Sequence, residues 1–212
     1  MTKLETSMPV RGISVALLLA VLAVAAPPAL AQEAPDALVK RVSTEALTTI
    51  KSDPQIQAGD VTHIRELIET KLAPHFDMTR MTALAMGKNW RTATPEQQKR
   101  LADEFRTLLV RTYSTALTKY RDETIEYRPL RANPGDTEVI VRTQVVRQGA
   151  QPVPIDYSLE KTPDGWKAYD VVIGGVSLVT NYRDEFNQQV QGGGIDGLIK
   201  TLSERNKGGP AK

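Results

Sequence analysis

The chain of 212 residues contains no cysteine and only two histidines, and both shortages narrow its chemistry. Without cysteine it has no disulfide, no thiol nucleophile, no cysteine-based zinc site and no residue that a lipoprotein could acylate. The histidines, His63 and His75, lack the spacing and the paired carboxylates of a metal site. We therefore expect no metal centre.

The chain also lacks a strong excess of charge of either sign. Its 27 basic and 25 acidic residues leave a formal net charge of +2, whereas a dedicated nucleic-acid-binding protein carries a clustered basic excess. Beyond residue 31 it has no apolar run near the roughly 20 residues that a membrane-spanning helix needs. These features argue against a nucleic-acid partner and against an internal membrane span.

The first 31 residues have the pattern of a secretory signal peptide. Lys3 and Arg11 give a basic start, residues 13–26 are apolar apart from Ser14, and Ala29-Leu30-Ala31 offers a small-residue cleavage site. The alternative, a membrane anchor, needs a longer apolar stretch of about 20 residues. We predict that residues 1–31 are removed and that the mature protein is a soluble protein of the periplasm or the cell exterior.

The mature chain has the size of one domain, which we place at residues 32–206, with a disordered tail at 207–212. Its first part shows apolar residues at helical spacing. The clearest helix start is Thr94, where Pro95 and Gln97 complete a capping box. We expect helices at 35–52, 61–72, 77–87 and 94–120, and two more helices at 177–191 and 195–205.

Between residues 125 and 173 the apolar period changes from 3.6 to 2. Val139, Val141 and Val145 alternate with polar residues, and turn sequences separate the strands. Strict alternation predicts a sheet with one buried face and one solvated face. We predict an α+β fold with helices packed on one face of a curved antiparallel sheet of about four strands, at 125–127, 139–145, 153–159 and 166–173.

Two polar residues near the end of the sheet are candidates for chemistry. Asp170 lies inside an apolar strand, where a buried charge needs a partner such as Arg183 or an arginine of the long helix. It has no histidine or second carboxylate at a catalytic spacing. Ser177 lacks the G-x-S-x-G elbow and is better explained as a helix N-cap. We expect Asp170 and Arg183 to be structural and predict no catalytic residues.

A group of methionines precedes the long helix. Met78, Met81 and Met86 lie close in sequence to Leu84 and Trp90, and methionine adapts to irregular or variable apolar neighbours. This group is either ordinary core or the wall of a binding site, and the residues alone leave both interpretations open.

Several segments, taken in their order and spacing, resemble the MlaC family of periplasmic phospholipid carriers, which includes toluene-tolerance proteins and a hopanoid-associated branch. They cover most of the mature chain and are Gly87–Arg91 with Thr94–Gln97, Glu104–Arg106 with Leu108-Leu109 and Thr112-Tyr113, Ile155–Tyr157, Trp166–Asp170, Gly175–Ser177 and Gly194–Leu198. The chain departs from the pattern at Gly174, where the family often has an acidic residue. Any role of that acidic group is therefore in doubt for this chain.

The resemblance implies a periplasmic shuttle that holds a phospholipid as cargo, with the acyl chains between the sheet and the helices and the head group outward. It implies no cofactor and no reaction. The implied partners are an outer-membrane lipoprotein complex and an inner-membrane ABC transporter with an MCE-type lipid-binding subunit. On this basis we expect a lipid-binding pocket lined by Met78, Met81, Ala85, Trp90, Phe105, Leu108, Leu109, Tyr113, Val141, Ile155, Tyr157, Val171, Ile173, Val176, Leu178 and Val179.

Two other classes of protein remain as alternatives. One is a secreted enzyme that uses Asp170 as a base inside a pocket, and the other is a periplasmic adaptor whose interior is filled core. The enzyme requires a catalytic partner for Asp170, and the adaptor requires that no ligand be bound.

Overall fold

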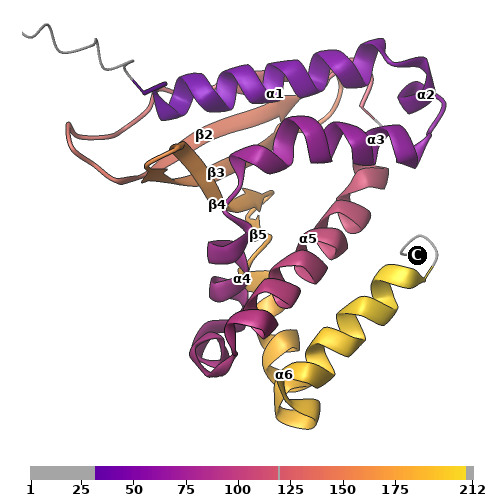
Figure 1. The fold of residues 1–212 in the computed structure, drawn as a ribbon. Helices are drawn as coiled ribbons and strands as arrows, with labels where there is room; N and C mark the ends of the chain where they lie inside the picture. The colour runs from indigo at the N-terminus through magenta and orange to yellow at the C-terminus, as the bar shows by residue number, and fades with distance from the viewer. Residues whose placement is uncertain (1–31, 119, 209–212) are drawn as a thin grey trace, which may run out of the picture. The chain divides into compact units, whose positions relative to one another are not determined.

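The computed structural model describes residues 32–118 and 120–208, so the predicted signal peptide lies outside the described residues. The described part has the expected α+β arrangement, with helices first, then an antiparallel sheet, then a long helix (Figure 1). None of the helices in these ranges combines the length and the apolar character that a membrane crossing requires.

The first helix, α1 (Pro35–Ser52), starts with proline in its first turn and buries one apolar stripe, which includes Leu38, Val39 and Ile50. Proline is suited to this position because its missing N–H has no partner there in any helix. Asp53 ends α1 and caps the short helix α2 (Pro54–Gln57) by accepting the Gln55 N–H at 2.8 Å.

The helix expected at 61–72 changes its hydrogen-bonding pattern half-way. An α-helix, α3 (Val61–Leu67), passes into a π-helical turn, η1 (Ile68–Leu72), and then into a 3₁₀ turn, η2 (Ala73–His75). Pro74 lies in η2, and proline cannot donate to the preceding turn and clashes with the carbonyl four residues earlier. The regular helix therefore ends before Pro74.

The next two helices have the predicted starts. Asp77 caps α4 (Met78–Met86) by accepting the Arg80 N–H at 2.7 Å. A 3₁₀ segment, η3 (Gly87–Thr92), leads to α5 (Pro95–Leu117), whose capping box between Thr94 and Gln97 is formed as expected. This helix ends at Leu117, three residues before the predicted end.

The sheet is an antiparallel meander in the order β1-β2-β3-β4-β5. The strands are β1 (Thr124–Tyr127), β2 (Glu138–Val146), β3 (Val153–Thr162), β4 (Gly165–Ile173) and β5 (Val176–Ser177). One row across it runs from Val141 to Tyr157 to Val171. We call the side that carries this row and packs against α1 the inner face.

The fifth strand and the late start of the last helix differ from the prediction. Gly174 and Gly175 both have positive φ, 58° and 87°, and turn the chain back so that Val176 pairs with Ile173. Ser177, predicted as a helix N-cap, therefore lies in β5. The helix follows after a 3₁₀ turn, η4 (Thr180–Tyr182), as α6 (Arg183–Lys207), with a break at Gly194 (φ 68°, ψ −173°).

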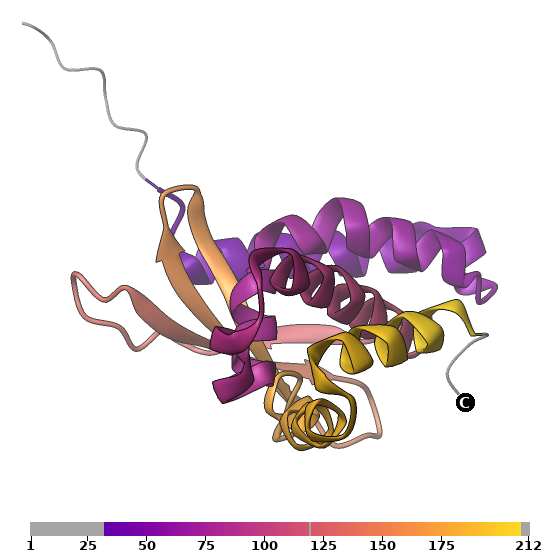
Figure 2. The ribbon, with the colours of Figure 1, turned by 60° about the horizontal axis from the view of Figure 1, so that its bottom comes forward.

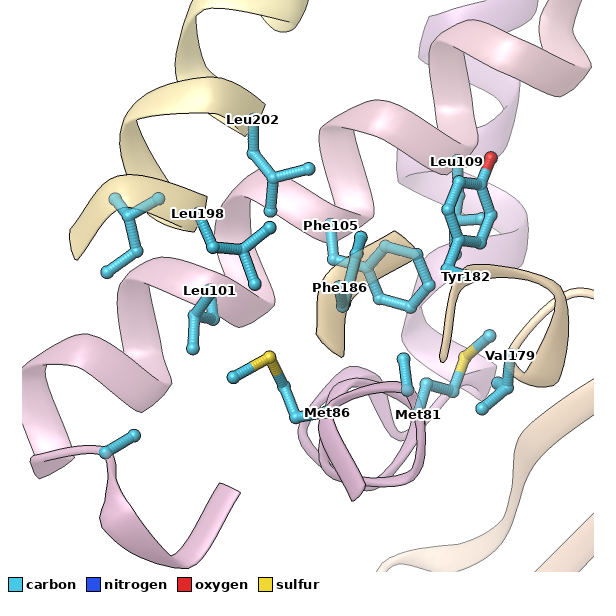
Figure 3. Close-up of a cluster of buried hydrophobic side chains, with 13 residues drawn as sticks. Met81, Met86, Leu101, Phe105, Leu109, Val179, Tyr182, Phe186, Leu198 and Leu202 are labelled. Atoms are coloured by element: carbon cyan, nitrogen blue, oxygen red, sulfur yellow. The ribbon is translucent and has the colours of Figure 1, made fainter. Parts of the chain in front are cut away.

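The helices α4, α5 and α6 enclose a packed cluster of their own, with α6 beside α5 and away from the sheet (Figures 1 and 2). Phe105 lies against Tyr182 and Phe186, and both ring centroids are 5.2 Å from its own in edge-on geometry (Figure 3). Leu101, Leu198 and Leu202 extend the cluster. Such interlocking of aromatic and aliphatic side chains fills the interior between the three helices.

Arg80 links α4 to the sheet. Its guanidinium pairs with Glu160 at 2.5 Å and with Glu138 at 2.7 Å, and it lies 3.6 Å from the centroid of the Tyr169 ring. These contacts raise the pKa of Arg80 against the opposing effect of its burial. A planar guanidinium suits such a site, because it can bind two carboxylates and stack on an aromatic ring together.

Candidate functional site

A largely apolar cavity lies between α1 and the inner face of the sheet. It encloses about 820 Å³ of empty space, including the part that opens to solvent. Four groups of residues line it: the buried stripe of α1, the turns η1 and η2, the end of α5 with the segment after it, and strands β1 to β4. These residues are Leu38, Val39, Val42, Ser43, Ala46, Leu47, Ile50, Leu72, His75, Phe76, Leu117, Tyr120, Ile125, Val145, Ile155, Tyr157, Leu159 and Ala168.

The local folding explains why the wall is apolar. Helical spacing places the apolar residues of α1 on one side, and the alternation of β2 and β3 turns their aliphatic residues toward that side. Leu38 and Val39 meet Val139, Val141 and Leu159 and close one end with a packed cluster. The cavity continues beyond this cluster, between two apolar surfaces that do not meet.

Four side chains bring polar atoms to the cavity wall: Ser43, His75, Tyr120 and Tyr157. The Ser43 hydroxyl already has partners in the protein. It donates to the Val39 carbonyl of its own helix at 2.5 Å, and it contacts the Tyr127 hydroxyl at 2.9 Å. Burial raises the pKa of the Tyr120 phenol and raises the pKa of Tyr157 far above its usual range. Both phenols are therefore neutral at physiological pH.

His75 lies at the part of the wall where η2 meets the sheet. Burial lowers the pKa of its imidazole, and the positive charges of Arg41 and Lys167 lower it further, while Glu33 and Glu45 act in the opposite direction. The neutral form is therefore favoured. Among the described residues no group of three or more histidine, aspartate or glutamate side chains is placed to hold a metal ion.

The structure brings two of the predicted pocket residues, Ile155 and Tyr157, to this cavity. A larger group lies in or against the packed helical cluster instead, where Met81, Ala85 and Phe105 are at most 1% exposed. Neighbouring side chains therefore enclose Met81, Ala85 and Phe105. The group in the helical cluster comprises Met78, Met81, Ala85, Trp90, Phe105, Leu108, Leu109, Tyr113 and Val179.

The remaining predicted residues lie on or after the strands. Val141 is 1% exposed and is covered by α1 in the cluster at the cavity's end. Val171 is buried, whereas Ile173 and Leu178 are partly exposed. Val176, next to the two glycines of the β4–β5 turn, is 52% exposed.

The sequence analysis did not assign α1 to the pocket, although it recognised the apolar stripe of this helix. Periodicity shows which face of a helix is turned inward, but it does not show whether the facing surface touches that face. Leu72, His75 and Phe76 gave still less signal, because they lie where regular helix gives way to π and 3₁₀ turns. Only the three-dimensional arrangement joins these segments.

Asp170 and Arg183 have separate partners in the structure. Asp170 accepts hydrogen bonds from the Val171 N–H at 2.8 Å, the Ser177 hydroxyl at 2.7 Å and the Val179 N–H at 3.3 Å. The Ser177 oxygen in turn accepts the Thr180 N–H at 2.9 Å. Arg183 donates from Nε to the Leu84 carbonyl at 3.1 Å. Asp170 thus fastens the β4–β5 turn, while Arg183 joins α6 to α4.

Comparison with known protein families adds to this geometry. The family model described as "MlaC protein" matches residues 40–204, which include most of α1, the whole sheet and most of α6. This chain belongs to the MlaC family. The match confirms the resemblance noted in the sequence, and the helices and sheet that it covers include the whole cavity wall from Val42 onward.

Two relatives are similar to this chain over most of their length. The toluene tolerance protein ttg2D of Pseudomonas putida is 27% identical over 173 residues, which cover 81% of this chain and 80% of the relative. The intermembrane phospholipid transport system binding protein MlaC of Haemophilus influenzae is 22% identical over 183 residues, covering 83% and 84% of the two chains.

A solved structure is also similar. It is the phospholipid-binding protein from Ralstonia solanacearum in complex with a phospholipid, which is 42% identical to this chain. The two superpose with a TM-score of 0.76, over 81% of this chain and 96% of the other. The fold shared with the MlaC family is thus one that has been observed with a phospholipid bound in a relative.

Proposed function

We propose that this chain is a periplasmic carrier that binds a phospholipid in the cavity between α1 and the sheet. The observation that supports this most strongly is the cavity itself, a largely apolar space between α1 and the sheet in a chain of the MlaC family. A structural relative at 42% identity, solved with a phospholipid, supports the same ligand class.

The energetics of acyl chains determine how such a carrier must work. Two acyl chains carry roughly 30 methylene groups, and each contributes about 0.8 kcal/mol when it leaves water, so complete burial exceeds about 20 kcal/mol. Non-covalent affinities saturate near this value. Release into water is therefore very slow, and lipid must leave the cavity while a partner shields the chains.

We further propose that the chain exchanges lipid with two membrane-bound partners. One is an outer-membrane lipoprotein complex, and the other is the MCE-type subunit of an inner-membrane ABC transporter. The name of the Haemophilus influenzae relative, an intermembrane phospholipid transport system binding protein, supports this assignment. A carrier that docks at both membranes avoids the unfavourable step of releasing acyl chains into water.

The contacts of Asp170 argue against the enzyme alternative. Both carboxylate oxygens of Asp170 accept hydrogen bonds within the β4–β5 turn and the segment after it. Asp170 also does not line the cavity. A base needs a free oxygen within reach of its substrate, so these contacts favour a structural role.

The test is to purify the protein from a bacterial host and measure bound lipid by native mass spectrometry and by extraction. We expect about one phospholipid per chain. Ala46→Phe, which adds volume on the cavity side of α1, should lower this ratio. Ala37→Phe is the matched control, because Ala37 is exposed on the same helix. Its lipid content should equal that of the original chain.

Two results would contradict the proposal. One is a mass spectrum with only the lipid-free protein, together with an extract that contains no phospholipid. The other is equal lipid content in Ala46→Phe and Ala37→Phe when circular dichroism shows both to be folded, because lipid would then be bound somewhere other than the cavity.

A further inference from the structure

Tyr157 is a polar group in an otherwise apolar part of the cavity wall. It lies on β3 between Val141 of β2 and Val171 of β4, and its ring faces α1. The side chain is partly buried and lines the cavity. Tyr157 therefore borders the region that we assign to the lipid.

The described residues leave this hydroxyl poorly satisfied. The neighbouring Thr143 is close enough to lower the pKa of Tyr157, against the dominant effect of burial, which raises it. Thr143, however, donates its own proton to the Ile155 carbonyl at 3.0 Å. No hydrogen bond of normal length and angle reaches the Tyr157 hydroxyl from any residue of the described ranges. A hydroxyl in a cavity wall that has no strong partner within the protein can bind a ligand or a water molecule.

The position of Tyr157 also limits what can reach it. Tyr127 is its neighbour on the sheet, because Tyr127 pairs with Thr143, and Thr143 pairs with Ile155, two residues before Tyr157. Tyr127 marks the surface, because its hydroxyl contacts the exposed Thr44 at 3.2 Å and the ammonium of Lys40 lies 5.8 Å from its ring centroid. Ser43, which lines the cavity, also contacts the Tyr127 hydroxyl at 2.9 Å, so the wall near Tyr157 approaches the surface beside Lys40.

The chemistry of a phospholipid identifies the matching group. Its phosphate is charged and is costly to bury without full compensation. The ester carbonyls that join the acyl chains to glycerol are neutral, accept hydrogen bonds and lie only a few bonds below the phosphate. A lipid whose phosphate stays in water near Lys40 would place an ester carbonyl at the depth of Tyr157.

We propose that Tyr157 donates a hydrogen bond to an ester carbonyl of the bound lipid, so that the cavity selects ester-linked over ether-linked lipids. This inference rests on the proposed function. It assigns a specificity-determining role to the Tyr157 hydroxyl. It also determines how deeply the lipid enters the cavity, because the ester carbonyl lies between the head group and the acyl chains.

The experiment uses competition between two lipids. Lipid-free full-length protein is incubated with vesicles that contain equal amounts of a diacyl phosphatidylcholine and its dialkyl ether analogue with the same chain lengths. Native mass spectrometry then gives the ratio of the two complexes. One neutral hydrogen bond corresponds to a preference of about 2- to 10-fold for the ester lipid. A ratio is insensitive to the fraction of protein that is folded.

Tyr157→Phe removes only the hydroxyl and should bring this ratio close to one. Tyr127→Phe is the matched control, since the Tyr127 hydroxyl contacts Ser43 and Thr44, and this variant should keep the original preference. Equal binding of both lipids by the original chain would overturn the inference and leave the proposed function standing. The same holds for a preference that survives in Tyr157→Phe or that disappears equally in Tyr127→Phe. Binding of neither lipid would overturn the proposed function, and the inference with it.

Discussion

Leu47 and Leu109 are identical side chains in different surroundings. Leu47 is on the cavity side of α1, where its neighbours leave empty space. Leu109 is 8% exposed in the packed cluster of α4, α5 and α6. The free energy that a leucine contributes depends on how well its surroundings are filled, so this pair distinguishes cavity wall from core.

We expect Leu109→Ala to lower the free energy of unfolding of lipid-free protein by about 2–5 kcal/mol, the usual cost of truncating a filled core. Leu47→Ala should cost less in the lipid-free protein and should reduce lipid content more. Urea denaturation and lipid extraction measure the two effects. The sequence analysis placed Leu109 in the pocket, so a smaller stability cost for Leu109→Ala than for Leu47→Ala would favour that prediction over our interpretation of the structure.

Asp170 and Ser177 offer a second comparison. Asp170→Asn keeps an oxygen for the backbone N–H groups but replaces the acceptor of the Ser177 hydroxyl with an amide, and Ser177→Ala removes that hydroxyl. Each variant should lower the free energy of unfolding by about 1–3 kcal/mol, because a buried polar group loses its partner. The double variant should cost less than the sum, because the two residues share one hydrogen bond. Additive costs, or lipid-ester hydrolysis that disappears in Asp170→Asn, would contradict this structural role.

His75 should make stability depend on pH. The unfolded chain protonates this imidazole near pH 6.5, whereas its pKa is lower in the folded protein. Below about pH 6.5 the unfolded state therefore binds more protons, and the free energy of unfolding falls as the pH falls. His75→Gln should show a smaller fall between about pH 7 and pH 5, measured by urea denaturation. Identical slopes in both proteins would show that the imidazole is not desolvated.

The break in α6 lies at only one of three consecutive glycines. Gly194 has φ 68° and ψ −173° inside the helix, whereas Gly192 and Gly193 do not have positive φ. A side chain is strained in the conformation of Gly194, although no neighbouring atom would contact an added Cβ at any of the three positions. The backbone geometry alone therefore determines the outcome of substitution.

Gly194→Ala should lower the free energy of unfolding by about 1–3 kcal/mol, the cost of holding a non-glycine residue in a sparsely populated conformation. Gly193→Ala should raise it by about 0.5–1 kcal/mol, because alanine loses less conformational freedom in a helix. Thermal and urea denaturation measure both changes. Destabilisation by Gly193→Ala equal to that by Gly194→Ala would mean that the break includes the whole glycine run.

Local signals predicted many of the elements. The capping box at Thr94 and the cap at Asp77 act within four residues, so the sequence contains all that is needed to recognise them. The fifth strand was not predicted, because Val176 and Ser177 become a strand only by pairing with β4. The same limit applies to the cavity: Ile155 and Tyr157, which were predicted to line a pocket, lie in its wall, whereas the contribution of α1 depends on what lies opposite it across the cavity.

The lipid-free protein as a whole contains a space that its ligand would fill. A ligand that binds only the folded state stabilises it by about 2.7 kcal/mol at a concentration 100 times its Kd. We therefore expect the midpoint of thermal unfolding to fall when phospholipid is stripped off and to recover when it is restored, as calorimetry can measure. If the midpoint of thermal unfolding stayed the same in protein that had rebound lipid, the lipid would have equal affinity for the folded and the unfolded chain.

The cavity wall joins the first helix of the described chain to strands that come far later in sequence. Val39 packs in one cluster with Val139 and with Ala168, so 100 or more residues separate the partners. At synthesis rates of about 5–20 residues per second, α1 is made roughly 5–30 s before its last partner strand. During that interval its apolar stripe has no sheet to cover it. Chain segments whose partners are distant in sequence fold slowly, and their exposed apolar surface promotes aggregation in the meantime. The side of α1 that lines the cavity in the finished protein is thus the side that most needs shielding while the chain is being made.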